Sequence, residues 1–491
     1  SPIAQPGEDT IDQVSLDIDW HFPWFTLNWV TGLHDRGQEF LVNASLGQHG
    51  VLGDRRGGRC GPLEFGLDGE GTTISTEARL SNVTDTRFGA LDWVAGVYYK
   101  DQSQKNSGEQ VIRDCDSFLG FQIPADPGGP YDIHVLDFDV DFRSKSVALF
   151  ADAIWDARED LHFTLGLRYL RDTVESPTKT RTGFTLAGSG VIIPGSEGIF
   201  GSGEFGDFTR GKENVYEAFT PKFGVSYDVT DDAMIFANVA QGFRTGGINI
   251  GAARNLTTGE EDPPDFDPDT AWSYELGIKS SWWESQLIVN LTGFVIIWDD
   301  IQAEVGGVGP AVTRNLGEAR SAGFELEFEG RPIEGLTLRS SVSFVDSRIT
   351  EDVFVDDPDI NANNNVKSGN TLQAPPWQAS FSAQYGFPIT GGLDGFLFGS
   401  ASYTDDTVSG PTNVDQDRKT DAYWIMNVRL GVEGEGWGLY VYANNLLSEY
   451  AVVETDILQT YIIRPRMIGV NFRMGFSGAE LSVPEFMGGG R

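Results

Sequence analysis

The feature that most constrains this chain is an alternation of apolar and polar residues that recurs in segments roughly ten residues long. One segment alternates Leu161, Phe163, Leu165, Leu167 and Tyr169 with His162, Thr164, Gly166 and Arg168. The same pattern returns in residues 336–344, 379–385, 424–432 and 468–476. Because successive side chains of a β-strand point to opposite faces, each segment predicts a strand with one apolar face. The sequence therefore predicts an all-β, antiparallel fold of about seventeen strands, from residues 12–20 to residues 467–476.

The connections between these segments separate a membrane barrel from a soluble β-sandwich, whose strands alternate in the same way. We expect short turns at 157–160, 230–232, 283–285 and 434–436, and long loops at about 45–71, 105–136, 185–213, 250–269 and 352–372. Outer-membrane barrels combine short periplasmic turns with long extracellular loops, and their strands cross the bilayer in ~9–11 residues. Aromatic residues near strand ends form the girdles of such barrels, and here they include Trp20, Trp24, Trp282, Trp283, Trp377 and Trp437. Both features favour a transmembrane barrel over residues 1–476, followed by a tail at 477–491.

Composition agrees with this interpretation and excludes several others. The mean hydropathy is −0.23, and strongly apolar runs such as 294–298 are far shorter than the ~20 residues of a membrane helix. Aromatic residues make up 12% of the chain, which excludes a disordered acidic protein. The formal net charge of −37 argues against a nucleic-acid partner, since a phosphate backbone needs a basic surface. Outer-membrane lipid is the expected environment.

Catalytic motifs are weak or absent in the sequence. The stretch 242–247 is rich in glycine, but no helix-forming run follows it and the phosphate-binding lysine is lacking, so we expect a bending strand. The five histidines are scattered and form no zinc motif. A barrel hydrolase would need a serine beside His162, which falls on a polar strand face, and no sequence feature selects one. We therefore expect no enzyme activity, no catalytic residue and no bound cofactor.

Two groups of charged residues remain as candidates. Arg168, Arg339, Arg429 and Arg473 fall on the polar positions of their strands, so we expect them on the lumen wall, paired with carboxylates of the plug or of neighbouring strands. A direct role in ligand binding is the less favoured alternative. Acidic residues cluster in two loops, at Glu260, Glu261, Asp262, Asp265, Asp267 and Asp269, and at Asp352, Asp356, Asp357 and Asp359. Such oxygen-rich runs can hold Ca²⁺, but they lack the spacing and turn glycine of an EF-hand loop. Solvated surface charge is the favoured interpretation and calcium the alternative.

Several short blocks, in order over most of the chain, resemble TonB-dependent outer-membrane receptors. The blocks are residues 146–151 with 165–169, 220–227 with 242–247, 273–279, 315 with 319–327, and 444–450 with 464–466 before a last strand ending at Phe476. The resemblance implies a barrel of about 22 strands around a plug, of which this chain supplies about seventeen. The plug, the coupling box and the first strands of the family pattern are absent from this sequence, and 15 residues follow Phe476.

The resemblance also implies a function and partners. It implies energy-coupled import of a scarce, large ligand, such as a ferric siderophore, cobalamin or a glycan, across the outer membrane of a Gram-negative bacterium. The implied partners are an inner-membrane coupling protein of the TonB type and the N-terminal part of the same receptor, or a second chain in its place. The chain begins Ser1-Pro2-Ile3 without an initiator Met or a signal peptide, so we expect a processed or truncated N-terminus. A passive porin or a structural barrel is the first alternative, and a barrel hydrolase the second.

The two cysteines give one further expectation. Counting strand direction back from Phe476 places Cys60 and Cys115 in extracellular loops one hairpin apart. Neighbouring loops can bring two Cα atoms to the ~5.5 Å that a disulfide requires. We therefore expect Cys60 and Cys115 to form a disulfide, with two free thiols as the alternative.

Overall fold

The structure is a computed structural model of the whole chain. It describes residues 7–44, 63–83, 91–115, 117–118, 121–122, 131–176, 178–186, 208–210, 213–249, 263, 265–305, 312–353, 365–455 and 460–475. The expected tail at 477–491 and the end of the last strand at Phe476 lie outside these residues.

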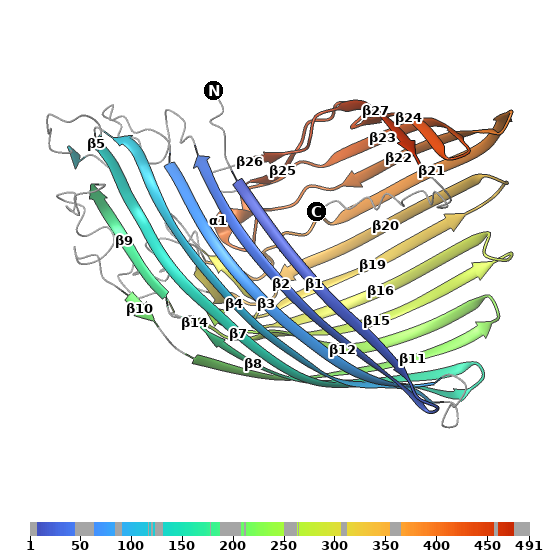
Figure 1. Ribbon diagram of the computed structural model, residues 1–491, viewed down its shortest axis with the longest axis horizontal. Helices are drawn as coiled ribbons and strands as arrows, with labels where there is room; N and C mark the ends of the chain where they lie inside the picture. The colour runs from blue at the N-terminus through green and yellow to red at the C-terminus, as the bar shows by residue number, and fades with distance from the viewer. Residues whose placement is uncertain are drawn as a thin grey trace.

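One antiparallel sheet forms a curved wall that contains nearly all of the described chain (Figure 1). Its seventeen wall strands, in spatial and chain order, are β1 (Gly7–His21), β2 (Phe25–Ala44), β3 (Leu63–Asn82), β4 (Leu91–Cys115), β7 (Tyr131–Arg158), β8 (Leu161–Glu175), β11 (Glu213–Thr230), β12 (Ala233–Arg244), β15 (Asp269–Trp282), β16 (Leu287–Asp299), β19 (Ala319–Gly330), β20 (Leu336–Ile349), β21 (Trp377–Thr390), β22 (Leu393–Thr404), β23 (Tyr423–Gly434), β24 (Trp437–Asn444) and β27 (Met467–Met474). The predicted all-β, antiparallel fold and its strand number are confirmed for the part of the chain that the structure describes.

The remaining elements are short. β9 (Thr178–Leu186) and β10 (Phe208–Arg210) pair with each other, and β9 also pairs with β7, so they extend the sheet beyond β8 and β11. The small hairpins are β5 (Ser117–Phe118) with β6 (Phe121–Gln122), β13 (Gly247–Ile248) with β14 (Asp265–Phe266), β17 (Gln302–Val305) with β18 (Val312–Asn315), and β25 (Val452–Thr455) with β26 (Thr460–Ile462). The helix α1 covers Asn413–Gln416. Among the described residues, no helix is both long and apolar enough to cross a membrane.

The two faces of the wall differ as the alternation predicts. Leu165 on β8 is 54% exposed and Leu276 on β15 is 68% exposed, although both lie in the middle of long strands. A soluble sandwich would bury this apolar face against a second sheet. The described residues instead form one large sheet and four two-stranded hairpins, so no second large sheet covers the apolar face. This exposure is what a strand facing lipid requires.

The connections are asymmetric, and their lengths correct part of the sequence prediction. The short turns follow β1, β7, β11, β15, β19, β21 and β23, and they lie together on the right-hand side of Figure 1. The loops expected at 45–71 and 105–136 are shorter than predicted, because residues 63–71, 105–115 and 131–136 continue β3, β4 and β7. In these outer parts the β4 residues on the apolar-face positions become polar, from Asp101 to Glu109, so the alternation disappears while the backbone pairing continues.

Glycines on the polar face receive aromatic rings from the neighbouring strand. A Cβ added at Gly277 would lie 2.6 Å from the ring of Phe236, and one added at Gly96 would lie 2.5 Å from the ring of Phe150. The same relation holds between Gly469 and Tyr442 at 2.5 Å. Each ring therefore lies against the backbone of its neighbour, where only glycine leaves room. The result is a closely packed wall surface on the polar side.

The two outermost strands each pair on one side within the described residues. β1 pairs with β2, and β27 pairs with β24, while no pairing joins β1 to β27. β1 ends at the short turn before Phe25, and β27 begins after the long connection from Asn444, so both run toward the side of the short turns. Direct pairing of β1 with β27 would be parallel in an otherwise antiparallel wall.

Candidate functional site

The polar face of the wall holds the four arginines that the sequence singled out. The apolar residues next to them in sequence, such as Leu167, Leu430 and Phe472, are exposed on the opposite face, as is Phe328, which pairs with Ser340 next to Arg339. Arg339 bonds the Glu329 carboxylate across the β19–β20 pair, with 3.0 Å between Nε and Oε2. The predicted carboxylate pairing is thus present at Arg339. Arg168 and Arg429 instead contact aromatic rings.

An acidic hollow lies on the same face over β12, β15, β16 and β19. Its volume is about 450 Å³, and its lining includes Glu275, Glu325 and Glu327 with Lys279 as a cation. Asn290 donates to Glu327 at 3.2 Å, and Lys279 stands 5.4 Å from the centre of the Phe236 ring. Three carboxylates beside one amine leave the hollow with a negative charge. Sequence reasoning missed this group, although the alternation around residues 273–279 and 319–327 places all three glutamates on polar positions.

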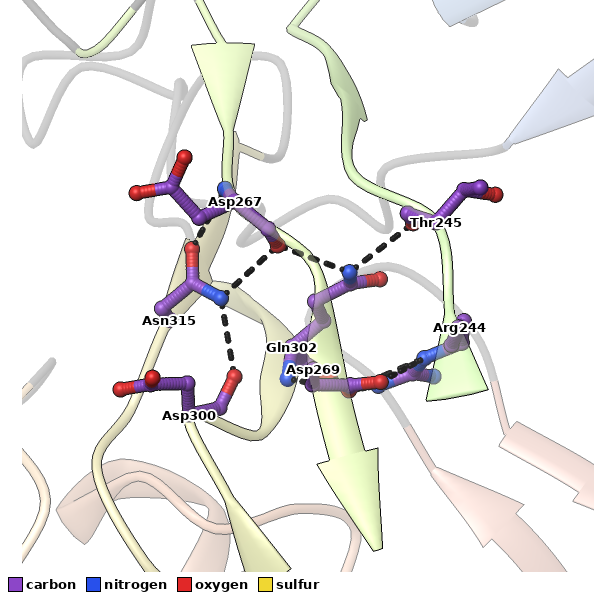
Figure 2. Close-up of polar contacts among 7 residues, drawn as sticks. All are labelled: Arg244, Thr245, Asp267, Asp269, Asp300, Gln302 and Asn315. Carbon is purple, nitrogen blue, oxygen red and sulfur yellow. Dashed lines mark hydrogen bonds and ion pairs between the residues drawn. The ribbon is translucent and has the colours of Figure 1, made fainter. Parts of the chain in front are cut away.

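A polar network closes the far end of β12, where that strand leaves the wall (Figure 2). The Asp269 side chain is only 2% exposed, and it is paired with Arg244, whose Nε lies 3.0 Å from Oδ2. The Gln302 backbone amide also donates to Asp269, at 3.0 Å. The Gln302 side-chain amide donates to the carbonyls of Thr245, at 3.0 Å, and Asp267, at 2.9 Å. The network therefore fixes the path of the chain just beyond the wall.

Asn315 completes this network from β18. Its side-chain amide donates to the carbonyls of Asp267 and Asp300, at 2.9 and 2.8 Å, and its oxygen accepts from the Asp267 amide at 2.9 Å (Figure 2). Asn249 acts in the same way nearby, since it bonds the carbonyl and the amide of Thr313. Asparagine side chains here replace the backbone pairing that ends with the strands. Sequence reasoning noted Asn315 only as part of a family block and did not note Asn249, because nothing local marks which asparagines bridge distant loops.

A small apolar core lies under these connections. It contains Ile301, Leu316, Ala319, Ile349 and Val366, each at most 5% exposed. Trp298 and Leu372 pack against it. The next connections are tied to each other by further bonds, including those of Gln416 to Thr371 and of Ser409 to the Thr455 carbonyl. The ends of the strands from β12 to β27 are thus joined into one braced rim.

The His162 environment bears on the hydrolase alternative. The His162 ring has Asp156 Oδ1 at 2.6 Å from Nδ1 and Asp228 Oδ2 at 3.3 Å from Nε2. Ser226 stands opposite His162 in the β8–β11 pair, but both ring nitrogens are directed to carboxylates. A general base needs one nitrogen free for the serine hydroxyl. The histidine therefore braces β7, β8 and β11 together.

Two earlier expectations fall largely on residues that the structure leaves undescribed. Cys60 lies outside the described residues, as do Glu260, Glu261, Asp262, Asp356, Asp357 and Asp359. The disulfide between Cys60 and Cys115 stays a prediction. Of the described acidic residues, Asp352 accepts the Ser368 backbone amide at 2.7 Å, and Asp265 accepts from Asn214 at 3.2 Å. The described residues contain no group of three or more ligating side chains arranged for a metal ion, and calcium binding also stays a prediction.

Comparison with known proteins matches the family described as "TonB dependent receptor-like, beta-barrel" over residues 3–446. The metal-pseudopaline receptor CntO of Pseudomonas aeruginosa is 26% identical over 199 residues, which cover 40% of this chain and 24% of CntO. The pesticin receptor of Yersinia pestis is 22% identical over 340 residues, or 68% of this chain and 44% of that receptor.

Solved structures share the fold at low sequence identity. The ferric yersiniabactin uptake receptor FyuA from Yersinia pestis superposes with a TM-score of 0.71 at 16% identity, over 96% of this chain and 62% of FyuA. The ferric-catecholate import receptor Fiu from E. coli K12 superposes with a TM-score of 0.69 at 15% identity, over 96% of this chain and 64% of Fiu. The chain thus spans less than two thirds of the length of each of these proteins.

Proposed function

The chain belongs to the TonB-dependent receptor family through its β-barrel domain, and from this premise we propose that it forms the wall of a receptor for energy-coupled import. Receptors of this family are outer-membrane β-barrels of Gram-negative bacteria, and the chain is accordingly an outer-membrane protein. The observation that carries the proposal is the family match over residues 3–446, on a wall whose apolar face is exposed along its strands.

The proposed cargo is a metal chelate of the siderophore type. The similar proteins include a metal-pseudopaline receptor, a ferric yersiniabactin uptake receptor and a ferric-catecholate import receptor. Cobalamin and glycans are the other ligand classes that the sequence resemblance implies. Metal chelates of the siderophore type are too large for the pores of passive channels. Their uptake therefore needs a receptor that is driven by a TonB-type coupling protein, which is the proposed partner.

The charge of the acidic hollow supports the proposal that another part of the receptor fills the lumen. Glu275, Glu325 and Glu327 face the polar side with one lysine among them. Carboxylates left without cations in a confined space repel each other. We propose that a plug presents cationic side chains to this hollow and so holds its place against the wall.

Within the described residues, β1 and β27 each have one edge without a paired strand. These edges support the proposal that the wall continues between the two strands. Backbone groups at an edge inside a bilayer cost several kcal/mol each when unpaired. Because β1 and β27 run in the same direction, only an odd number of further strands can join them by antiparallel pairing. We propose that strands of the same receptor, or of a second chain, fill this position.

Uptake measurements test the proposal against a passive porin. A strain that lacks this receptor should lose uptake of radiolabelled ferric chelates from its own culture medium under iron limitation. Restoring the full-length gene should restore uptake, and removing the coupling protein should abolish it again. Uptake that continues at the same rate without the coupling protein would favour the porin.

A further inference from the structure

Six arginines on the polar face of the wall fall into two groups by what they contact. Four of them hold carboxylates: Arg36 with Asp9, Arg79 with Glu77, Arg244 with Asp269, and Arg339 with Glu329. Arg168 and Arg429 differ, because their described contacts are to aromatic rings. The whole chain has 72 acidic residues against 35 basic ones, so a shortage of carboxylates does not explain the difference.

Arg168 lies between two rings on the first half of the wall. Its guanidinium carbon is 5.8 Å from the centre of the Tyr98 ring on β4 and 5.8 Å from the centre of the Phe150 ring on β7. Thr220 is its partner on β11, and Lys222 is the partner of the nearby Gly166 on the same face. Among the described residues, no carboxylate is recorded in contact with the Arg168 guanidinium. Asp152 on β7 is the other partner of Gly166, so one cation and one carboxylate stand on either side of that glycine.

Arg429 has a similar environment on the second half of the wall. Its guanidinium carbon is 3.9 Å from the centre of the Tyr440 ring and 5.7 Å from the centre of the Phe396 ring. Its Nε atom is buried without a hydrogen-bond partner. The neighbouring Glu433 accepts a hydrogen bond from the hydroxyl of Tyr440.

Stacking of this kind leaves the edge of a guanidinium available. An aromatic ring covers the flat face of the group, while its N–H donors lie in the plane and point outward. A stacked guanidinium is also held in place, so it loses little freedom when it binds a second group. Its paired donors match the two oxygens of a carboxylate.

The two arginines are placed on separate parts of one surface. β8 and β23 are nine strands apart in the wall, and both arginines lie on its polar face in the inner part of their strands. We propose that Arg168 and Arg429 are two anion-binding positions on the lumen wall, each of which binds a carboxylate or phenolate oxygen. The proposal rests on the proposed function in one respect, namely that this face lines the lumen. The anion comes either from the imported ligand or from the segment that fills the lumen.

Binding of a small carboxylate to the full-length receptor tests the proposal. The probe is 4-bromobenzoate, whose bromine is located by anomalous X-ray scattering and whose affinity follows from the shift of the thermal midpoint with concentration. The variants are Arg168→Gln, Arg429→Gln and the double substitution, with Arg320→Gln as the control. Arg320 is an exposed arginine on the apolar-face positions of β19, without a recorded ion pair.

The expected result is a bromine peak beside each arginine in the wild-type receptor. In the double variant, the dissociation constant of 4-bromobenzoate should rise at least about 10-fold, because a charged hydrogen bond to the carboxylate is lost. If the receptor's own plug supplies the anion, a protein carboxylate lies against the guanidinium instead, and the glutamine variants lower the thermal midpoint. Arg168→Lys and Arg429→Lys keep the charge without the paired donors, and they should fall between wild type and glutamine.

Two outcomes would overturn the proposal. The first is a full-length receptor in which neither a protein carboxylate nor the probe contacts either guanidinium. The second is probe binding that stays unchanged in the double variant, which would mark an adventitious additive only. Loss of heat-modifiable gel mobility identifies a glutamine variant that has not folded. In that case the probe affinity of the lysine variants decides between the two outcomes. Coupled uptake is measured separately, so failure of the anion sites leaves the proposed function untouched.

Discussion

Replacing Leu276 by arginine should destabilise the wall far more than the same change at Thr292. Leu276 lies on the apolar face of β15 and is 68% exposed. Its partner on β16 is Gly293, whereas Thr292 beside it pairs with Gly277 and points into the acidic hollow. The two positions therefore share one height in the membrane and differ in the face that they occupy.

The depth of Leu276 sets the magnitude. Leu276 is six residues from Trp282, the end of β15 at the short turn. At about 3.3 Å per residue and a tilt of about 40°, Leu276 lies about 15 Å above Trp282 in an apolar band about 25 Å tall. An arginine near the middle of the bilayer costs about 2–4 kcal/mol. This corresponds to a decrease of roughly 30- to 900-fold in the equilibrium constant for folding.

At Thr292 the new arginine would meet Glu325, its partner on β19, beside Glu275 and Glu327. We expect a change below about 1 kcal/mol, since a solvated ion pair contributes little in either direction. The assay is urea unfolding of the full-length receptor in lipid vesicles, with heat-modifiable gel mobility as the measure of folded protein. Equal losses from Leu276→Arg and Thr292→Arg would refute the assignment of the two faces.

Further substitutions test the packing and the rim in the same unfolding assay. Gly277→Ala should cost about 1–3 kcal/mol because its Cβ would lie 2.6 Å from Phe236, whereas Gly293→Ala, with no neighbour nearer than 3.9 Å, should be close to neutral; similar values would contradict the packing of rings on glycines. Asp269→Asn should cost about 1–3 kcal/mol through its buried bonds to Arg244 and Gln302. As its control, Arg348→Gln breaks the ion pair with Asp346, in which both side chains are about half exposed, and should cost at most about 1 kcal/mol. Equal losses from Asp269→Asn and Arg348→Gln would contradict a stabilising role for the buried Asp269–Arg244 pair. Asn445→Ala removes bonds to Glu449 and Arg464 and should cost about 2–4 kcal/mol, and an unchanged midpoint would show that the rim does not depend on them.

The alternation was sufficient to predict the strands of the wall because a single period of two governs each of them. Leu165 and Gly166 follow it directly: Leu165 is 54% exposed, while Gly166 is buried on the other face. The prediction failed for residues 63–71, 105–115 and 131–136, which were assigned to loops. Beyond the membrane both faces of a strand meet water, so the apolar face disappears while the hydrogen-bonded ladder remains.

The residues of the candidate site were predicted less completely, for a different reason. Polar strand positions place Arg339 on one face, but they cannot say that Glu329 will bond it while Arg429 stacks on Tyr440. Those choices depend on the register between strands, which the turns fix and the sequence does not display. The rim network is still less visible, because Asn315 bonds Asp267, a residue 48 positions away.

The rim has a consequence for how a ligand would be held at this end of the wall. Its connections are tied by asparagine side chains: those of Asn249 and Asn315 bond backbone groups of a neighbouring connection, and that of Asn445 bonds backbone groups within its own. Ordering a loop on binding costs free energy for each residue that is fixed. Connections that are already fixed by such bonds and by the core around Leu316 would not incur this cost again. The braced rim from β12 to β27 is therefore suited to act as a preformed contact surface for the ligand, while Arg429, one of the two proposed anion-binding positions, lies on the wall between this rim and the short turns.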